Sequence, residues 1–106
     1  LFPEADIQCV TTCADAWKQS QSFDIVVVEE HLRGESGSAL LARFSELAAP
    51  PLLIGVSIDP DADRKCFEVA RVDKIWGKPP PWFDCRLKKE LVQALLAKRI
   101  KQQHSA

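Results

Sequence analysis

Four consecutive apolar residues, Ile25 to Val28, run directly into two carboxylates, Glu29 and Glu30. This unbroken Ile/Val run predicts a strand over Phe23–Glu29 that is buried on both faces, which is typical of parallel sheets. In an open α/β sheet, binding sites lie outside the carboxyl ends of the strands. The two glutamates therefore stand where a functional site is expected.

The rest of the chain alternates strand and helix patterns around this run. Further strands are predicted over Asp6–Thr12, Leu52–Ser57 and Asp73–Gly77. Helices are predicted over Thr12–Gln21, Ser38–Leu47, Asp59–Arg71 and from Asp84 to the basic C-terminal turns. The order β-α-β-α-β-α-β-α predicts an α/β fold of four β-α units, with a parallel sheet and helices on both faces.

Local signals give these elements their ends and their buried sides. Asp59 followed by Pro60 predicts a helix N-cap with proline at the first helical position. The Gly34–Gly37 segment predicts a turn, and Trp17 is the expected anchor of the first helix. The apolar residues expected to pack inward from the last two helices are Cys66, Phe67, Val69, Ala70, Leu87, Leu91, Ala94 and Leu95.

Length and charge narrow the class of protein. The 106 residues predict one domain, and the first residue, Leu1, suggests a piece of a longer protein in which residues 98–106 form a linker or tail. A net charge of -1 offers no attraction for nucleic acid or an anionic membrane. Without a signal peptide or apolar span, we expect a cytoplasmic protein, with a nuclear location also open.

The cysteines and histidines do not have the spacing of a metal site. Cys9 and Cys13 form one C-x3-C pair, whereas Cys66 and Cys85 stand alone. A zinc site requires a second close pair or nearby histidines, and the two histidines supply neither. We therefore expect reduced, partly buried thiols and no bound metal.

Three predicted strand ends bring together a small group of polar residues. The run over Phe23–Glu29 ends in Glu29, the next ends in Ser57, and the last is followed by Lys78. Because parallel strands end at the same edge of a sheet, a carboxylate, a hydroxyl and a lysine should meet there. Such a group predicts an anion site, or an ion pair between the carboxylate and the lysine.

These residues resemble the receiver domains of response regulators, the CheY-like family with a flavodoxin-like fold. In that family an apolar strand ends in the phosphoacceptor Asp, and glycines follow five and eight positions later, as Gly34 and Gly37 follow Glu29. Ser57 matches the strand-end Ser/Thr, and Lys78-Pro79 matches the Lys-Pro. The resemblance implies pocket roles for Glu30, Ser57, Lys78 and Pro79, and a one-residue shift would exchange Glu29 and Glu30. Without that shift, we expect Glu30 to face solvent beside Glu29. Ser57 has two open interpretations, the switch hydroxyl of the family or an ordinary strand-end hydroxyl that caps the next helix.

The chain also departs from the family pattern. Glu29 replaces the acceptor Asp, and its extra methylene moves the carboxylate out of reach for phosphorylation. Arg33, Ile58 and Ile75 replace the usual loop Pro, small Ala and aromatic switch, although Trp76 is adjacent to the last. The acidic pair that binds magnesium has no counterpart, because the chain begins after the first strand and helix of the family.

The missing first strand leaves three explanations open. It can lie outside this chain, it can come from another chain, or the first two predicted strands can pair directly in a four-stranded sheet. The chain order does not choose among them, although the family order 2-1-3-4-5 places the missing strand in the middle of the sheet.

We expect a pseudo-receiver that signals by contact with a protein or a neighbouring domain, without enzymatic activity or cofactor. Ile75, Trp76, Trp82 and Phe83 are the candidate partner surface, and a histidine kinase or a second copy are candidate partners. One alternative is a phosphorylatable receiver whose magnesium-binding residues lie upstream. Another is a small enzyme or nucleotide binder, which lacks a Gly-rich loop and a nucleophile–base pair.

Overall fold

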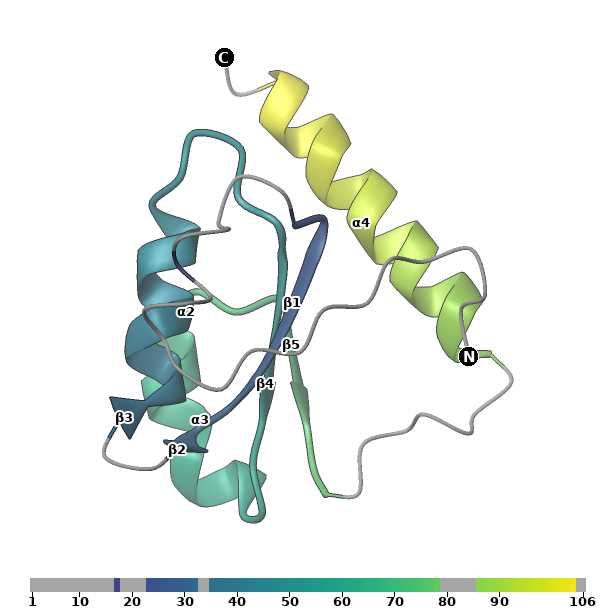
Figure 1. Ribbon diagram of the computed structural model, residues 1–106. Coiled ribbons are helices and arrows are strands. Elements are labelled where there is room, and N and C mark those ends of the chain that lie inside the picture. The colour runs from purple at the N-terminus through teal and green to yellow at the C-terminus, as the bar shows by residue number, and fades with distance from the viewer. Residues whose placement is uncertain (1–16, 18–22, 33–34, 79–85, 105–106) are drawn as a thin grey trace.

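A computed structural model describes residues 17, 23–32, 35–78 and 86–104 (Figure 1). The elements are β1 (Ile25–Glu29), β2 (His31–Leu32), β3 (Glu35–Ser36), α2 (Gly37–Ser45), β4 (Leu52–Val56), α3 (Pro60–Val69), β5 (Lys74–Trp76) and α4 (Leu87–His104). The predicted strand over Asp6–Thr12 lies outside the described residues, as does the predicted helix over Thr12–Gln21 apart from Trp17.

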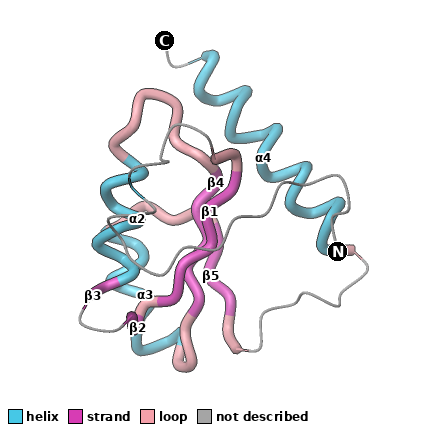
Figure 2. Tube along the Cα trace, in the orientation of Figure 1, coloured by secondary structure: helices cyan, strands magenta, loops and turns pink. Residues whose placement is uncertain are grey.

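Three parallel strands form the sheet in the order β1-β4-β5 (Figure 2). Ile25 pairs with Leu52 and Glu29 with Val56, while Val56 also pairs with Trp76 on the other side. The strands therefore end level with one another, as the unbroken apolar runs predict. Three β-α units are described, and the fourth, at the start of the chain, is outside the described residues.

The sheet lies between two helical layers. Figure 1 shows α2 and α3 on one face and α4 on the other. Two apolar clusters fill the layers. The first joins Val26 and Leu53 of the sheet to α2 and α3 through Leu40, Leu41, Phe44, Phe67 and Ala70. The second joins Leu52 and Ile54 to Leu87 and Leu91 of α4. Successive strand residues point to opposite faces, so one strand, β4, contributes to both clusters.

The prediction that β1 is buried on both faces is wrong. Only Val26 is buried in this strand, and Val27 is 37% exposed, whereas all five residues of β4 are buried. The reason is position in the sheet. β4 has a strand on each side, while β1 pairs with β4 alone among the described strands. An apolar run in the sequence indicates a strand but does not determine how deeply that strand is buried.

Capping defines the starts of two helices. Ser36 caps α2 and accepts a hydrogen bond from the Ala39 amide. Asp59 caps α3 and accepts from the Ala62 amide at 3.2 Å, with Pro60 at the first helical position. The predicted cap at Asp59 is therefore confirmed, and the predicted Gly34–Gly37 turn is corrected. Gly34 lies outside the described residues, Glu35 and Ser36 form β3, which pairs with β2, and Gly37 is the first residue of α2.

The predicted apolar side of α3 is only half right. Phe67 and Ala70 are buried, but Cys66 is exposed and Val69 is 76% exposed. At about 100° per residue, Cys66 and Val69 lie far from the face that Phe67 presents to the sheet. Gly55 of β4 makes room for that face, since a Cβ there would lie 2.5 Å from the Phe67 ring.

The inward face of α4 matches the prediction. Leu87 and Leu91 are buried, and Ala94 and Leu95 pack against the same cluster. The predicted cap of this helix, Asp84, lies outside the described residues. The ring of Trp17 meets Phe44 edge-on at 5.4 Å between centroids, so Trp17 anchors its segment to α2 as well as to the first cluster.

The C-terminal half of α4 is tied to the amino ends of the strands. Lys98 Nζ lies 2.7 Å from both Asp73 Oδ2 and the Pro51 carbonyl oxygen. Arg99 pairs with Asp24 just before β1. These contacts hold α4 antiparallel to the strands, which leaves the carboxyl edge of the sheet to the loops. Within the described part of the chain, no helix is long and apolar enough to cross a membrane.

Candidate functional site

The candidate site lies at the carboxyl edge of the sheet. Parallel pairing in register brings the end of β1, the residue after β4 and the second residue after β5 to the same edge. These positions hold Glu29, Ser57 and Lys78. The amide of Ser57 donates to the Trp76 carbonyl at 3.0 Å, which continues the pairing of β4 and β5 up to the site.

Glu29 and Lys78 form an ion pair across this edge. Lys78 Nζ lies 2.7 Å from Glu29 Oε1, and the two side chains are 34% and 48% exposed respectively. Both groups are partly solvated, so water and salt screen the attraction. The pair nevertheless joins the first and last described strands of the sheet, which no backbone hydrogen bond does directly.

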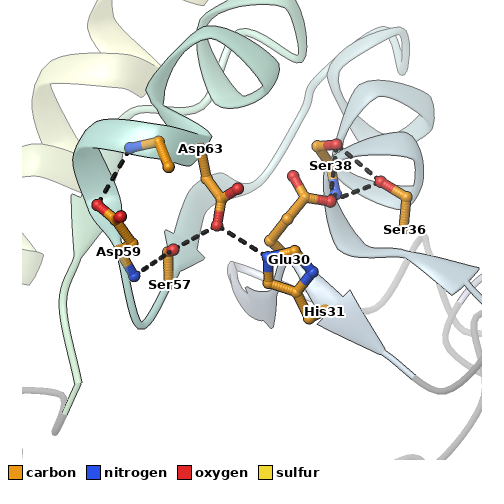
Figure 3. Close-up of polar contacts among 8 residues, drawn as sticks. Glu30, His31, Ser36, Ser38, Ser57, Asp59 and Asp63 are labelled. Atoms are coloured by element: carbon orange, nitrogen blue, oxygen red, sulfur yellow. Dashed lines mark hydrogen bonds and ion pairs between the residues drawn. The ribbon is translucent and has the colours of Figure 1, made fainter.

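Glu30 contradicts the prediction that it faces solvent. Its residue is only 7% exposed, on the side of the sheet that carries α2. Glu30 Oε1 accepts hydrogen bonds from the Ser36 hydroxyl at 2.6 Å, the Ser38 hydroxyl at 3.0 Å and the Ser38 amide at 3.3 Å (Figure 3). Glu30 Oε2 is buried without a partner in the described residues. The carboxylate is drawn inward because the N-terminus of α2 offers donors and a positive dipole end.

Strand geometry separates the roles of the two glutamates. Neighbouring residues at a strand end point to opposite faces, so Glu29 faces Lys78 while Glu30 turns under α2. The backbone keeps this arrangement, since the Glu30 amide donates to the Val56 carbonyl at 3.0 Å and the Gly37 amide to the Glu30 carbonyl at 2.8 Å. The sequence motif alone does not distinguish the two carboxylates.

Gly37 allows α2 to start close against the end of β1. A Cβ at this position would lie 1.8 Å from the carbonyl oxygen of Glu29 and 2.9 Å from a methyl of Val28. A side chain here would therefore push the helix away from the strand. The glycine eight positions after Glu29 is required by this contact between two backbones.

Ser57 is buried and bound to α3. Its hydroxyl donates to Asp63 Oδ2 and accepts from the Asp59 amide at 3.0 Å. His31 Nε2 lies 3.1 Å from the same oxygen of Asp63, as Figure 3 shows. The Asp63 carboxylate thus connects the β2–β3 hairpin to the end of β4. Of the two open interpretations of Ser57, this geometry favours an anchor for the next helix.

The candidate partner surface is only partly described. Pro79, Trp82 and Phe83 lie outside the described residues. Ile75 packs against the cluster under α2 and α3, whereas Trp76 packs against the cluster under α4. Since the two side chains point to opposite faces of β5, they do not form one continuous patch.

The described part of the site offers an ion pair and several hydrogen bonds. Within the described residues, no group of three or more His, Cys, Asp or Glu could hold a metal ion. The Glu29 carboxylate, which the resemblance places at the acceptor position, is engaged by Lys78.

Sequence reasoning missed three residues of this site. Ser36 and Ser38 flank the first helical residue, and this spacing could have indicated a partner for a preceding carboxylate. Asp63 gives no such signal, because an acidic residue in a first helical turn is common without any tertiary partner.

Comparison with known proteins bears on the fold. No family model and no curated protein matches the chain. A search of solved structures finds the signal receiver domain of a protein described as a Luxo repressor from Vibrio parahaemolyticus, with a TM-score of 0.72 and 17% sequence identity. The match covers 98% of this chain and 81% of that one. The chain therefore has the flavodoxin-like fold of a receiver domain, as its motifs indicate.

Proposed function

We propose that this chain is a pseudo-receiver, a domain of receiver fold that signals by contact and does not accept a phosphoryl group. The observation that carries the proposal is the ion pair between Glu29 and Lys78 at 2.7 Å. The resemblance places an acceptor Asp and a phosphate-binding Lys at these two positions. In this chain the carboxylate and the lysine neutralise one another.

Two features support the loss of phosphoryl transfer. Glu29 is one methylene longer than the acceptor Asp of the family, and its carboxylate lies 2.7 Å from the lysine. The Ser57 hydroxyl, at the position of the family's strand-end Ser/Thr, donates its hydrogen bond to Asp63. Glu29, Ser57 and Lys78 therefore lie at the strand ends where a receiver site is expected, while their carboxylate, hydroxyl and ammonium groups bind partners within the chain.

The same contacts support a signalling role. The Glu29–Lys78 pair links the end of β1 to the residues after β5, and the Ser57–Asp63 bond links the end of β4 to α3. Such links favour a constant surface at this edge, which suits recognition by a protein or a neighbouring domain. We propose such a partner, and no enzymatic activity, for this chain.

The test is incubation of the chain with acetyl phosphate and Mg²⁺, followed by intact mass measurement. We expect an unchanged mass, with a phosphorylatable receiver domain as the positive control under the same conditions. A mass increase of one phosphoryl group, lost when Glu29 is replaced by Gln, would overturn the proposal. It would favour the alternative of an active receiver.

A second variant separates two causes of the expected unreactivity, the extra length of Glu29 and the absence of groups that activate the acceptor. Glu29→Asp restores the length of a phosphoacceptor without adding metal ligands. If only this variant gains a phosphoryl group, the extra methylene alone prevents the reaction. If neither protein gains one, the described site also lacks the groups that activate the acceptor.

A further inference from the structure

The side of α4 that faces the sheet changes in character along the helix. Leu87 and Leu91 are buried in the second cluster, where Leu95 packs beside them. The next positions at helical spacing on this side are Lys98 and Gln102, and both are half-buried. The helix therefore docks through apolar side chains in its first half and through polar side chains in its last turns.

The polar side chains bind backbone oxygens just before β4. Lys98 Nζ donates to the Pro51 carbonyl at 2.7 Å, and Gln102 Nε2 donates to the Pro50 carbonyl at 2.9 Å. Lys98 Nζ also lies 2.7 Å from Asp73 Oδ2, just before β5. A single turn of the helix thus contacts the amino ends of two neighbouring strands.

The carboxylate that binds Lys98 is held in place by the sheet. Asp73 Oδ2 accepts from the Leu53 amide at 2.7 Å, and the Asp73 amide donates to the Leu53 carbonyl at 2.8 Å. The side chains of Lys98 and Asp73 are 17% and 28% exposed. Arg99 also pairs with Asp24, but these side chains are 50% and 69% exposed, so water screens them more strongly. The Lys98 contact is therefore the main tie of the last turns.

Apolar packing adds little to these turns. Leu96 and Ile100 are 53% and 54% exposed, and within the described part of the chain neither apolar cluster contains a residue of α4 beyond Leu95. Separating the first half of the helix from the sheet would expose Leu87 and Leu91 to water, which is costly. Separating the last turns exposes carbonyls, a carboxylate and an ammonium, and water can hydrogen-bond to all of them. The two parts of α4 therefore differ in the free energy needed to open them.

We propose that the last turns of α4, residues 98–104, form a clasp that opens and closes while the first half of the helix stays docked. Lys98 closes the clasp by binding Asp73 and Pro51 at the same time. Opening releases the amino ends of the strands from the helix without unfolding the domain. The clasp lies at the amino edge of the sheet, opposite the candidate site, so it does not depend on the proposed function.

Hydrogen exchange of the whole chain, measured by mass spectrometry of short overlapping peptides, tests the clasp. Lys98→Met removes the ammonium and keeps a long side chain of high helix propensity. We expect exchange over residues 98–104 to become at least about tenfold faster, while residues 87–95 and the strands stay unchanged. Lys89→Met is the matched control, since Lys89 is exposed on the same helix, and it should leave exchange unchanged.

Asp73→Asn tests the other side of the contact. The asparagine oxygen can still accept from the Leu53 amide but carries no charge, so this variant should also speed exchange over residues 98–104. Adding it to Lys98→Met should change the rate by less than about twofold, because both substitutions remove the same contact. The proposal is overturned if the two effects add in full, if Lys98→Met leaves the last turns unchanged, or if it speeds exchange equally along all of α4. It is also overturned if the last turns of the native chain already exchange like an unstructured peptide.

Discussion

The buried hydroxyl of Ser57 donates its hydrogen bond to the carboxylate of Asp63, four residues after the N-cap of α3. Ser57 is 1% exposed, and the Asp63 side chain is 14% exposed. The bond therefore lies largely away from water and joins the end of β4 to the first turn of the next helix. It also sets the direction of the hydroxyl that matches the strand-end Ser/Thr of the family.

Asp63→Ala should destabilise the chain, because it leaves the buried Ser57 hydroxyl without its acceptor. An unsatisfied buried donor costs about 1–3 kcal/mol, and we expect a loss of this order in the free energy of unfolding from urea titration. Asp61→Asn is the control. It lies in the same helical turn with a side chain that is 91% exposed, so it should cost no more than about 1 kcal/mol. Equal losses for the two variants would mean that the Ser57 bond contributes nothing.

Glu30→Ala should be more damaging than Glu29→Ala, although the two residues are neighbours. The Glu30 carboxylate accepts three hydrogen bonds at the start of α2, and a hydrogen bond to a charged group has a net worth of about 1.5–3 kcal/mol. Glu29 loses only a half-exposed ion pair, worth about 0–1 kcal/mol. Urea titration of both variants compares them directly. A larger loss for Glu29→Ala would contradict the inward position of Glu30.

Two glycines should respond differently to alanine. In Gly55→Ala the new methyl meets the Phe67 ring at 2.5 Å, and in Gly37→Ala it meets the Glu29 carbonyl oxygen at 1.8 Å. Overpacking of this kind costs about 1–3 kcal/mol or more. Phe67→Leu should recover part of the loss caused by Gly55→Ala, since a smaller side chain makes room. No comparable change in a neighbouring side chain should rescue Gly37→Ala, because the obstacle is backbone. Thermal unfolding of the single and double variants tests both statements.

Arg71→Gly should stabilise the chain. Arg71 has φ of 62°, directly after the C-cap of α3, and the Val72 amide donates to the Phe67 carbonyl as in a Schellman motif. A non-glycine residue in this left-handed region costs about 1–2 kcal/mol, so we expect a gain of about 1 kcal/mol in the free energy of unfolding. Arg71→Ala, which keeps the Cβ, should show no such gain. A loss of stability in Arg71→Gly would indicate that the arginine side chain makes a contact worth more than the strain.

Local sequence patterns predicted the elements well. The Ile/Val run of β1, the Asp59-Pro60 start of α3 and the inward face of α4 all depend on residues close together in the chain. The positions of Glu29, Ser57 and Lys78 at or just after strand ends also predicted that they lie at one edge of the sheet, because parallel strands end on the same side. These features follow from periodicity, capping and chain direction.

Burial and pairing required the three-dimensional arrangement. Val27 is partly exposed because β1 has one described neighbour in the sheet, and no local pattern contains that information. The contact of Ser57 with Asp63 depends on how α3 is rotated on the sheet, which Phe67 and Gly55 decide by packing.

The two adjacent glutamates show the division most clearly. That two carboxylates follow a strand at the carboxyl edge of a parallel sheet is already clear from the residue pattern. That Glu29 pairs with Lys78 while Glu30 is buried under α2 becomes clear only when the elements are packed together. A charged side chain takes its position from the partners within a few ångströms of it, and these belong to other elements of the fold. For these two residues those partners come from β5 and from the N-terminus of α2.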